Sequence, residues 1–252
     1  MKNKNKIGLA LGGGAVLGAA HIGVLKAIEE LNIRIDYLAG TSIGAFVAAF
    51  FGFGKNWEEI REIALELKWI DISGLSLSQY GLLSNEKLGE LITRHLGDKK
   101  IEDASIPLAM IATDISNGKK VVLNDGAVAD AAMASTSIPG IFQPVEINKK
   151  MLVDGGIVEN VPIHTVREMG ADYIIGVDLN AKHSYDKPEN IIDVMVNSFH
   201  FTLQASAKLQ TEDAELLLQP DLSSFNRSNM GQVEDLIQKG YNDSIKKLKG
   251  IT

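Results

Sequence analysis

Cysteine is absent from this sequence of 252 residues. Its absence excludes disulfide bonds, a thiol nucleophile and thiolate metal sites, and is typical of a protein of the reducing cytoplasm. Pairs of histidines or carboxylates with metal-ligand spacing, such as H-E-x-x-H, are missing as well. We therefore expect no metal and no other cofactor.

Long apolar runs and an excess of positive charge are also missing. No window approaches the roughly 20 apolar residues of a transmembrane helix, and the apolar run at residues 7–11 is too short for a signal peptide. The formal net charge is −7, so the chain lacks the excess of positive charge that is typical of proteins that bind nucleic acid. These features predict a soluble cytoplasmic protein without a nucleic-acid partner. Any contact with a membrane surface is expected to be peripheral and transient.

What the sequence does contain is a regular alternation of strand-like and helix-like segments, with no linker and no repeat. Strands are predicted at residues 7–11, 36–39, 107–115, 119–123, 151–153, 172–179 and 215–218. Helices are predicted at 18–32, 43–51, 84–96, 127–136, 190–209 and 233–248, with two more beginning after Asn56 and at Pro162. This alternation favours a single α/β domain over residues 1–252, with a mainly parallel central sheet flanked by helices.

Residues 68–83 are the least regular part of the chain. Apolar side chains there have neither a helical nor a strand period. Two interpretations stay open, an ordinary loop packed on the core and a mobile apolar cap over a lipid substrate.

The stretch at residues 40–44 reads G-T-S-I-G, a G-x-S-x-G motif centred on Ser42. A strand before the motif and a helix after it are the context of a nucleophile elbow, in which the serine adopts a strained backbone conformation. Gly40 and Gly44 would remove Cβ atoms that otherwise collide. The N-terminus of the next helix would offer unpaired N–H groups to a nearby oxyanion.

A second motif, three glycines at Gly12–Gly14 between a strand and a helix, predicts an anion site. The anion is either a dinucleotide pyrophosphate or the oxyanion of an acyl-transfer intermediate. A dinucleotide fingerprint requires glycine where Leu17 stands, and an acidic residue at the end of the second strand. Asp36 instead precedes that strand, so an oxidoreductase of the Rossmann type is the weaker alternative.

Asp154 ends a predicted strand and is followed by two glycines, a pattern of a turn aspartate or of a base partner for Ser42. His164, His183 and His200 follow it, in the chain order of a Ser-Asp-His triad, but none lies in a motif. His21 is expected to pack or to brace the glycine loop rather than to act in catalysis.

The order of these motifs resembles the patatin-like phospholipase family. The sequence has G-G-G…G-x-x-H-I-G-V-L, G-T-S-I-G, A-S-x-S-I-P-x-x-F-x-P and D-G-G-x-x-x-N-x-P, within about residues 7–180. The resemblance implies an α/β lipid acyl hydrolase that uses a Ser–Asp dyad on a lipid or other ester substrate. Ser42 would be the nucleophile and Asp154 the base. The amides of Gly12, Gly13 and Gly14 would form the oxyanion hole, with the register open by one residue.

One position departs from the family pattern. Many members carry Arg or Lys where this chain has Leu17, just before the last glycine of the loop. The departure leaves a second interpretation open, a weak or non-catalytic relative that keeps the fold for binding or regulation. Neither the head group nor the oligomeric state follows from the sequence.

Overall fold

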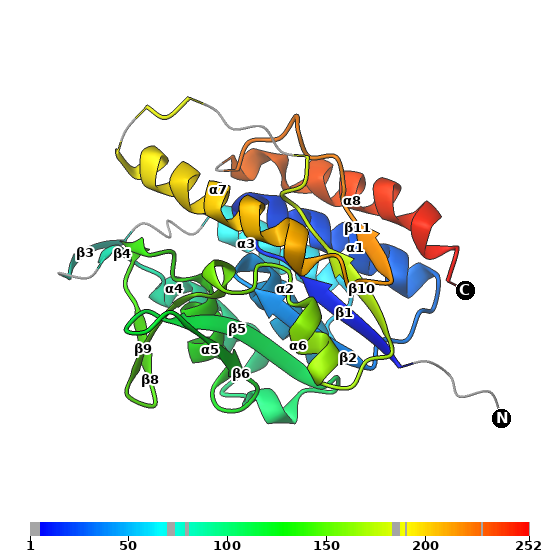
Figure 1. Cartoon of the computed structure of the whole chain (residues 1–252), viewed down its shortest axis with the longest axis horizontal. Helices are drawn as coiled ribbons and strands as arrows, with labels where there is room; N and C mark the ends of the chain where they lie inside the picture. Colours follow the sequence, from blue (N-terminus) through cyan, green and yellow to red (C-terminus); the bar gives the residue numbers. More distant parts are fainter. Residues whose placement is uncertain are drawn as a thin grey trace.

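The structure, a computed structural model, describes residues 6–69, 74–78, 81–182, 187–189, 191–227 and 229–251. In this part of the chain a mixed sheet of eight strands forms the centre, in the order β11-β10-β1-β2-β5-β9-β8 with β6 also paired to β5 (Figure 1). The strands are β1 (Ile7–Leu11), β2 (Tyr37–Thr41), β5 (Leu108–Asp114), β6 (Lys119–Leu123), β8 (Val145–Ile147), β9 (Lys150–Asp154), β10 (Tyr173–Val177) and β11 (Leu216–Leu218). The five strands from β11 to β5 run parallel, as predicted. Both β6 and β9 pair with β5 in the antiparallel sense.

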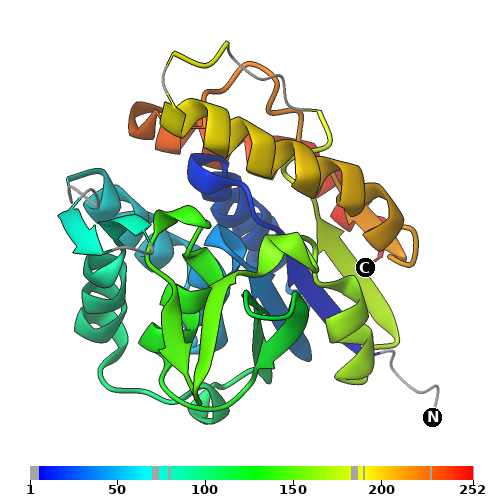
Figure 2. The same cartoon turned by 60° about the vertical axis from the view of Figure 1, so that its left-hand side comes forward.

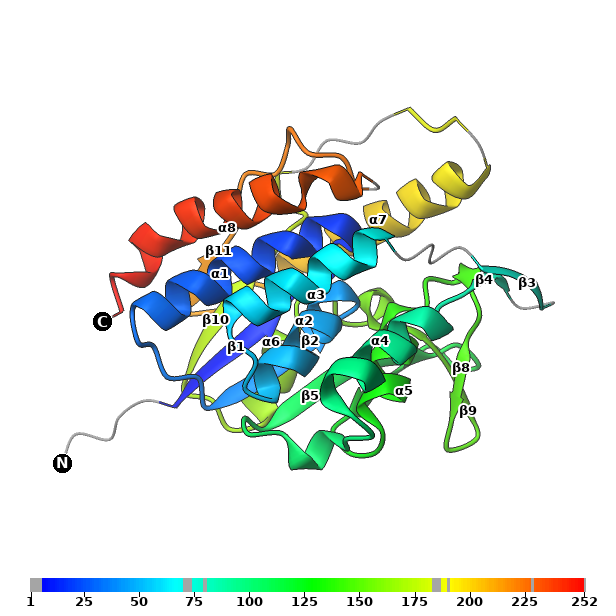
Figure 3. The same cartoon turned by 180° about the vertical axis from the view of Figure 1, so that it is seen from behind.

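Helices cover both faces of this sheet. They are α1 (Ala19–Glu30), α2 (Ile43–Gly52), α3 (Trp57–Trp69), α4 (Glu86–Leu96), α5 (Val128–Thr136), α6 (Ile163–Glu168), α7 (Ile191–Gln210) and α8 (Val233–Leu248). The larger core joins α1, α2, α3 and α8 to one face (Figure 3). On the other face β1, β2 and β5 each contribute one buried alanine, Ala10, Ala39 and Ala109, to the smaller core that includes the short helix α6.

The two helices at opposite ends of the chain, α1 and α8, cross at glycines. A Cβ at Gly23 would lie 2.0 Å from the Ile237 carbonyl oxygen, and one at Gly240 would lie 2.1 Å from the Ala20 carbonyl oxygen. Only residues without a side chain allow the two backbones to approach this closely. The crossing therefore fixes the C-terminal helix against the helix that follows the glycine loop.

Residues 68–83 were predicted to be irregular, and that prediction is wrong for most of the segment that the structure describes. Strands β3 (Gly74–Ser78) and β4 (Gly81–Ser84) form an antiparallel pair, and β7 (Gly140–Phe142) adds to β4 in parallel. The sequence gives little sign of them because all three are short, with only three to five residues each, and each begins with glycine. Residues 70–73 and 79–80 lie outside the described part, so the cap hypothesis stays a hypothesis.

No helix among the described residues is both long enough and apolar enough to cross a membrane.

Candidate active site

Ser42 lies in the tight turn between β2 and α2, with φ 56° and ψ −129°. This conformation is unfavourable for a residue with a side chain, and strain of this kind is concentrated at functional sites. A Cβ at Gly40 would lie 2.4 Å from the Gly44 oxygen, and one at Gly44 would lie 2.1 Å from the Leu11 oxygen. The predicted elbow geometry, with its requirement for both glycines, is therefore present.

Hydrogen bonds from two other segments hold the elbow. The Ser42 N–H donates to Ser135 Oγ (2.9 Å), and the Ser135 hydroxyl donates to the Ile111 carbonyl (2.6 Å). The Thr41 hydroxyl donates to the Glu159 carbonyl (2.8 Å). Ser135 belongs to the A-S-x-S-I-P stretch, which the sequence marked as a motif without showing what this serine does.

Strand β5 brings Ser42 and Asp154 together. Thr41 pairs with Ile111 on this strand, and Asp154 pairs with the next residue, Ala112. Two chain segments more than a hundred residues apart thus end beside adjacent positions of β5. Gly155 makes the approach possible, since a Cβ there would lie 2.2 Å from the Ile111 oxygen.

The Asp154 side chain is fully buried. Burial raises the pKa of its carboxyl to about 7, against the smaller opposing effects of hydrogen bonds from Ser42 and the Gly156 N–H. Oδ1 accepts the Gly156 N–H at 2.8 Å, whereas Oδ2 has no hydrogen bond of ordinary geometry within the described chain. The Ser42 hydroxyl is therefore a near neighbour of the carboxyl rather than a tightly bound donor, as is common before a substrate binds.

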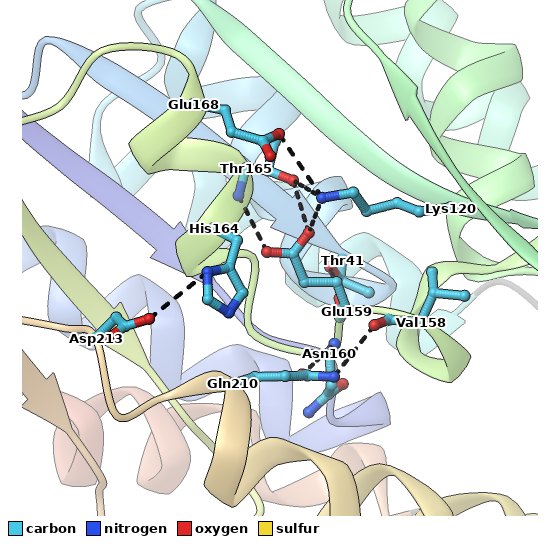
Figure 4. Close-up of polar contacts among 10 residues, drawn as sticks. All are labelled: Thr41, Lys120, Val158, Glu159, Asn160, His164, Thr165, Glu168, Gln210 and Asp213. Atoms are coloured by element: carbon cyan, nitrogen blue, oxygen red, sulfur yellow. Dashed lines mark hydrogen bonds and ion pairs between the residues drawn. The ribbon is translucent and has the colours of Figure 1, made fainter.

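The loop that follows Asp154 is held by two groups of contacts (Figure 4). The buried Glu159 carboxylate accepts the Thr165 N–H (3.1 Å), the Thr165 hydroxyl (2.6 Å) and Lys120 Nζ (2.9 Å). Gln210, at the end of α7, accepts the Asn160 N–H (2.8 Å) and donates to the Val158 carbonyl (3.2 Å). These contacts leave Asp154 little freedom to move away from the elbow.

The glycine loop runs past the same site. The Gly12 N–H donates to the Val177 carbonyl (3.1 Å) and the Gly13 N–H donates to the Asn160 carbonyl (3.2 Å). Within the described chain, the N–H groups of Gly14 and Ala15 donate to no acceptor. The free donors of this loop are therefore at Gly14 and Ala15. Of the three predicted donors, Gly12, Gly13 and Gly14, only Gly14 is free.

His21 braces this loop, as predicted. Its Nε2 lies 2.7 Å from the Gly12 carbonyl oxygen and must carry the proton, since a carbonyl only accepts. Burial lowers the pKa of this imidazole to about 4, so the ring stays neutral at physiological pH.

The other described histidines do not form a triad with this site. His164 lies on the surface with Nδ1 3.8 Å from Asp213 Oδ2, and His95 Nε2 lies 3.1 Å from Glu66. His200 is buried with Nδ1 3.4 Å from Arg227 Nη1. His183 is outside the described residues. Nor do the described residues contain a group of three or more His, Asp or Glu side chains suited to a metal ion.

An apolar cavity of about 410 Å³ extends from Ser42 into the helical layer. Its walls are almost entirely hydrocarbon and come from α1, α2, α3 and α4, with further contributions from α5, β7, α8 and neighbouring loops. Residues that line it include Ile22, Phe46, Val47, Ile60, Leu67, Leu88, Ile138 and Phe142. A cavity of this kind suits a bound apolar group.

Comparison with known proteins agrees with this geometry. The family model for patatin-like phospholipase matches residues 9–167. An NTE family protein of Mycobacterium tuberculosis, described as uncharacterized, is 34% identical over 184 residues, which cover 71% of this chain and 50% of that protein. Patatin-like phospholipase domain-containing protein 7 of Rattus norvegicus is 33% identical over 192 residues, covering 72% of this chain and 14% of that protein. The chain belongs to the patatin-like phospholipase family.

Solved structures show the same fold at low sequence identity. VipD from Legionella pneumophila has a TM-score of 0.58 at 12% identity, over 98% of this chain and 67% of that one. The ExoU–SpcU complex of Pseudomonas aeruginosa gives 0.54 at 17% identity, over 98% and 51%. The chain spans half the length of the mycobacterial relative and about a seventh of the rat protein.

Proposed function

We propose that this protein is a serine acyl hydrolase that cleaves carboxylic esters of lipids. One observation carries the proposal, namely a strained elbow serine that stands between a buried carboxyl and an apolar cavity. The cavity would hold the acyl chain, and the ester carbonyl would lie at Ser42. Membership of the patatin-like phospholipase family supports the same class of substrate.

In the first step Ser42 Oγ attacks the ester carbonyl carbon while Asp154 Oδ2 takes the hydroxyl proton. The carbonyl electrons move to the oxygen, and the free N–H groups of Gly14 and Ala15 stabilise this oxyanion. When the intermediate collapses, the C–O bond breaks and Asp154 returns the proton to the leaving alcohol. Water then hydrolyses the acyl-enzyme, with Asp154 again the base.

A pKa of about 7 suits Asp154 to this task. A carboxyl of ordinary pKa is a weak base, whereas one that titrates near neutrality is still ionised in part and binds the proton more strongly. The partner-free Oδ2 leaves one oxygen available to receive the proton.

Of the two alternatives, the oxidoreductase of the Rossmann type is not supported by the position of Asp36. Asp36, the acidic residue that precedes β2, accepts the Ile7 N–H at the start of β1 and pairs with Arg34. It therefore lies at the opposite end of these strands from the glycine loop. The non-catalytic alternative rests only on Leu17, whose side chain is fully buried in the core.

The proposal includes a transient contact of α7 with a zwitterionic lipid surface. Among the described side chains of this helix, the exposed ones form one stripe of Ile191, Val194, Ser198, Phe201, Thr202 and Leu209, and none of these six is charged. The hydroxyls of Ser198 and Thr202 donate to the helix's own carbonyls four residues earlier (2.7 and 3.1 Å), which suits an apolar surrounding. Figures 1 and 2 show α7 above the turn after Asp154, and Leu203 on its buried face lies against Gly156.

Labelling with a fluorophosphonate probe, beside a panel of p-nitrophenyl esters and phospholipids, tests the proposed activity. We expect the wild type to be labelled and to hydrolyse esters, and Ser42→Ala to lose both properties. Ser116→Ala, in the exposed β5–β6 turn, serves as the control and keeps both. Labelling that survives in Ser42→Ala places the nucleophile elsewhere. A folded wild type that neither labels nor hydrolyses any ester favours the non-catalytic alternative.

A further inference from the structure

The two free amides of the glycine loop, at Gly14 and Ala15, lie between two hydrogen-bonded residues, Gly13 and Val16. Both of these residues are connected by hydrogen bonds to Arg227. On one side the Gly13 carbonyl accepts Asn180 Nδ2–H at 2.8 Å, and Asn180 Oδ1 accepts Arg227 Nη2–H at 2.8 Å. On the other side the Val16 N–H donates to the Arg227 main-chain carbonyl at 3.2 Å. Gly14 and Ala15 stand between these contacts, and Ala15 is held at φ 51°.

Both partners are buried, so the contacts are stronger than they would be on the surface. Arg227 is 9% exposed and Asn180 is 1% exposed. In such surroundings a charge-assisted hydrogen bond is short and fixes geometry, and its loss leaves buried polar groups without partners. A contact of this type holds a loop in one conformation.

We propose that Arg227 is a positioning residue that holds the Gly14 and Ala15 amides in the orientation required for the oxyanion. The role of these amides rests on the proposed function, whereas the anchoring does not. The loop itself, Gly12–Gly18, contains no charged residue, and Leu17 stands just before its last glycine. Here a cation from the C-terminal segment, more than two hundred residues away, supports the loop from outside.

The chain offers a set of variants that separates positioning from general stability. Arg227→Met removes the guanidinium and keeps most of the apolar stem. Asn180→Asp keeps the shape and the contact with Arg227 but removes the donor to the Gly13 carbonyl. Arg61→Met is the matched control, because the described contacts of the Arg61 guanidinium are with Glu62 and Glu234 and not with the glycine loop.

Two measurements are made on each variant. Hydrogen exchange of the Gly13, Val16 and Leu17 amides reports on the loop without any substrate, because all three are hydrogen-bonded. Hydrolysis of a soluble p-nitrophenyl ester gives kcat and KM. We expect Arg227→Met and Asn180→Asp each to exchange at least tenfold faster and to lose kcat by about 10- to 100-fold, with KM within about twofold.

The double variant supplies a further criterion. Because both side chains act through one contact to Gly13, the combined loss of kcat should barely exceed the larger single loss. If Arg227→Met does not fold by circular dichroism, Asn180→Asp and Arg227→Lys carry the test, with Arg227→Lys expected to lose less kcat than Asn180→Asp.

The proposal is overturned if the amides of folded Arg227→Met and Asn180→Asp exchange at the wild-type rate. It is also overturned if these variants change only KM, or if the loss of kcat in the double variant equals the product of the two single losses. A loss of the same size in Arg61→Met also overturns it. If the wild type hydrolyses nothing, the proposed function fails, and the exchange rates alone still decide whether Arg227 positions the loop.

Discussion

At the scale of single residues, Asp154 has two properties that act in opposite directions. Its carboxyl is fully buried, which raises its pKa to about 7 and favours the protonated form. The proposed base must, however, be ionised when the ester arrives. The fraction of active enzyme is therefore expected to rise with pH through neutrality.

We expect Asp154→Asn to lower kcat by several orders of magnitude, because an amide cannot take the serine proton. In the wild type, kcat/KM should fall below about pH 7 as the carboxyl is protonated, and this acid limb should vanish from the residual activity of Asp154→Asn. The measurement is a pH–rate profile with a soluble ester.

His164→Ala, on the surface, is the control for this experiment and should cost less than about tenfold. If the loss in any single His→Ala variant equals that in Asp154→Asn without unfolding, the base is a histidine and the dyad is wrong.

At the scale of elements, α7 has two different faces. Its inner side, with the buried Leu203 and the half-buried Gln210, contacts the loop that follows Asp154. Its exposed side carries the apolar stripe described above. The net charge of −7 gives no general attraction to anionic lipid, so any docking would depend on apolar contact at this stripe.

Replacing Phe201 and Leu209 together by serine should weaken binding to phosphatidylcholine vesicles by about tenfold or more, since burial of such side chains contributes about 1.5–3 kcal/mol each. Hydrolysis of vesicle lipid should fall, and hydrolysis of a soluble butyrate ester should stay the same. Vesicle flotation and the two assays provide the measurements. Ile115→Ser is the matched control, because Ile115 is an exposed apolar residue outside α7.

Equal vesicle binding by the α7 variant and the wild type would contradict the surface assigned to this helix. A wild type that forms dimers in solution, and an α7 variant that is monomeric, would show that the stripe binds a second copy instead.

At the scale of the whole molecule, the buried Asp154 lowers the stability of the fold. Its pKa is about 7 in the folded state and 3.8 ordinarily, so the folded state binds the proton more tightly than the unfolded state does. Ionisation of Asp154 therefore does not affect the free energy of unfolding below about pH 4. It lowers this free energy progressively between about pH 4 and 7, and by a constant amount above about pH 7.

Asp154→Asn should therefore be more stable than the wild type at pH 8, by up to about 4 kcal/mol, and should show no such gain at pH 4. Urea unfolding followed by circular dichroism at the two pH values measures this difference. A gain of equal size at both pH values would show that ionisation is not its source.

Features that depend on near neighbours in the chain were predictable from sequence. Asn56 and Glu59 form the predicted reciprocal cap, with N–H to side-chain bonds of 2.9 and 2.8 Å, and the last helix has the predicted bounds, residues 233–248. The strain at Ser42 likewise follows from its own turn and the glycines on either side. Turns, caps and helical faces involve residues within about four positions, so one short window contains the interacting groups.

What only the tertiary structure decided are the contacts between distant segments. The sequence predicted the amides of Gly12–Gly14 as donors, but Val177 and Asn160 occupy the first two, so the free pair is Gly14 and Ala15. No local pattern marks Arg227, because its contacts depend on where the chain returns after α7. Strands β3, β4 and β7 were missed for the same reason, since short strands are stabilised by their partners rather than by their own sequence. Local sequence determined the strained turn at Ser42, whereas strand pairing determined that Asp154 lies beside it.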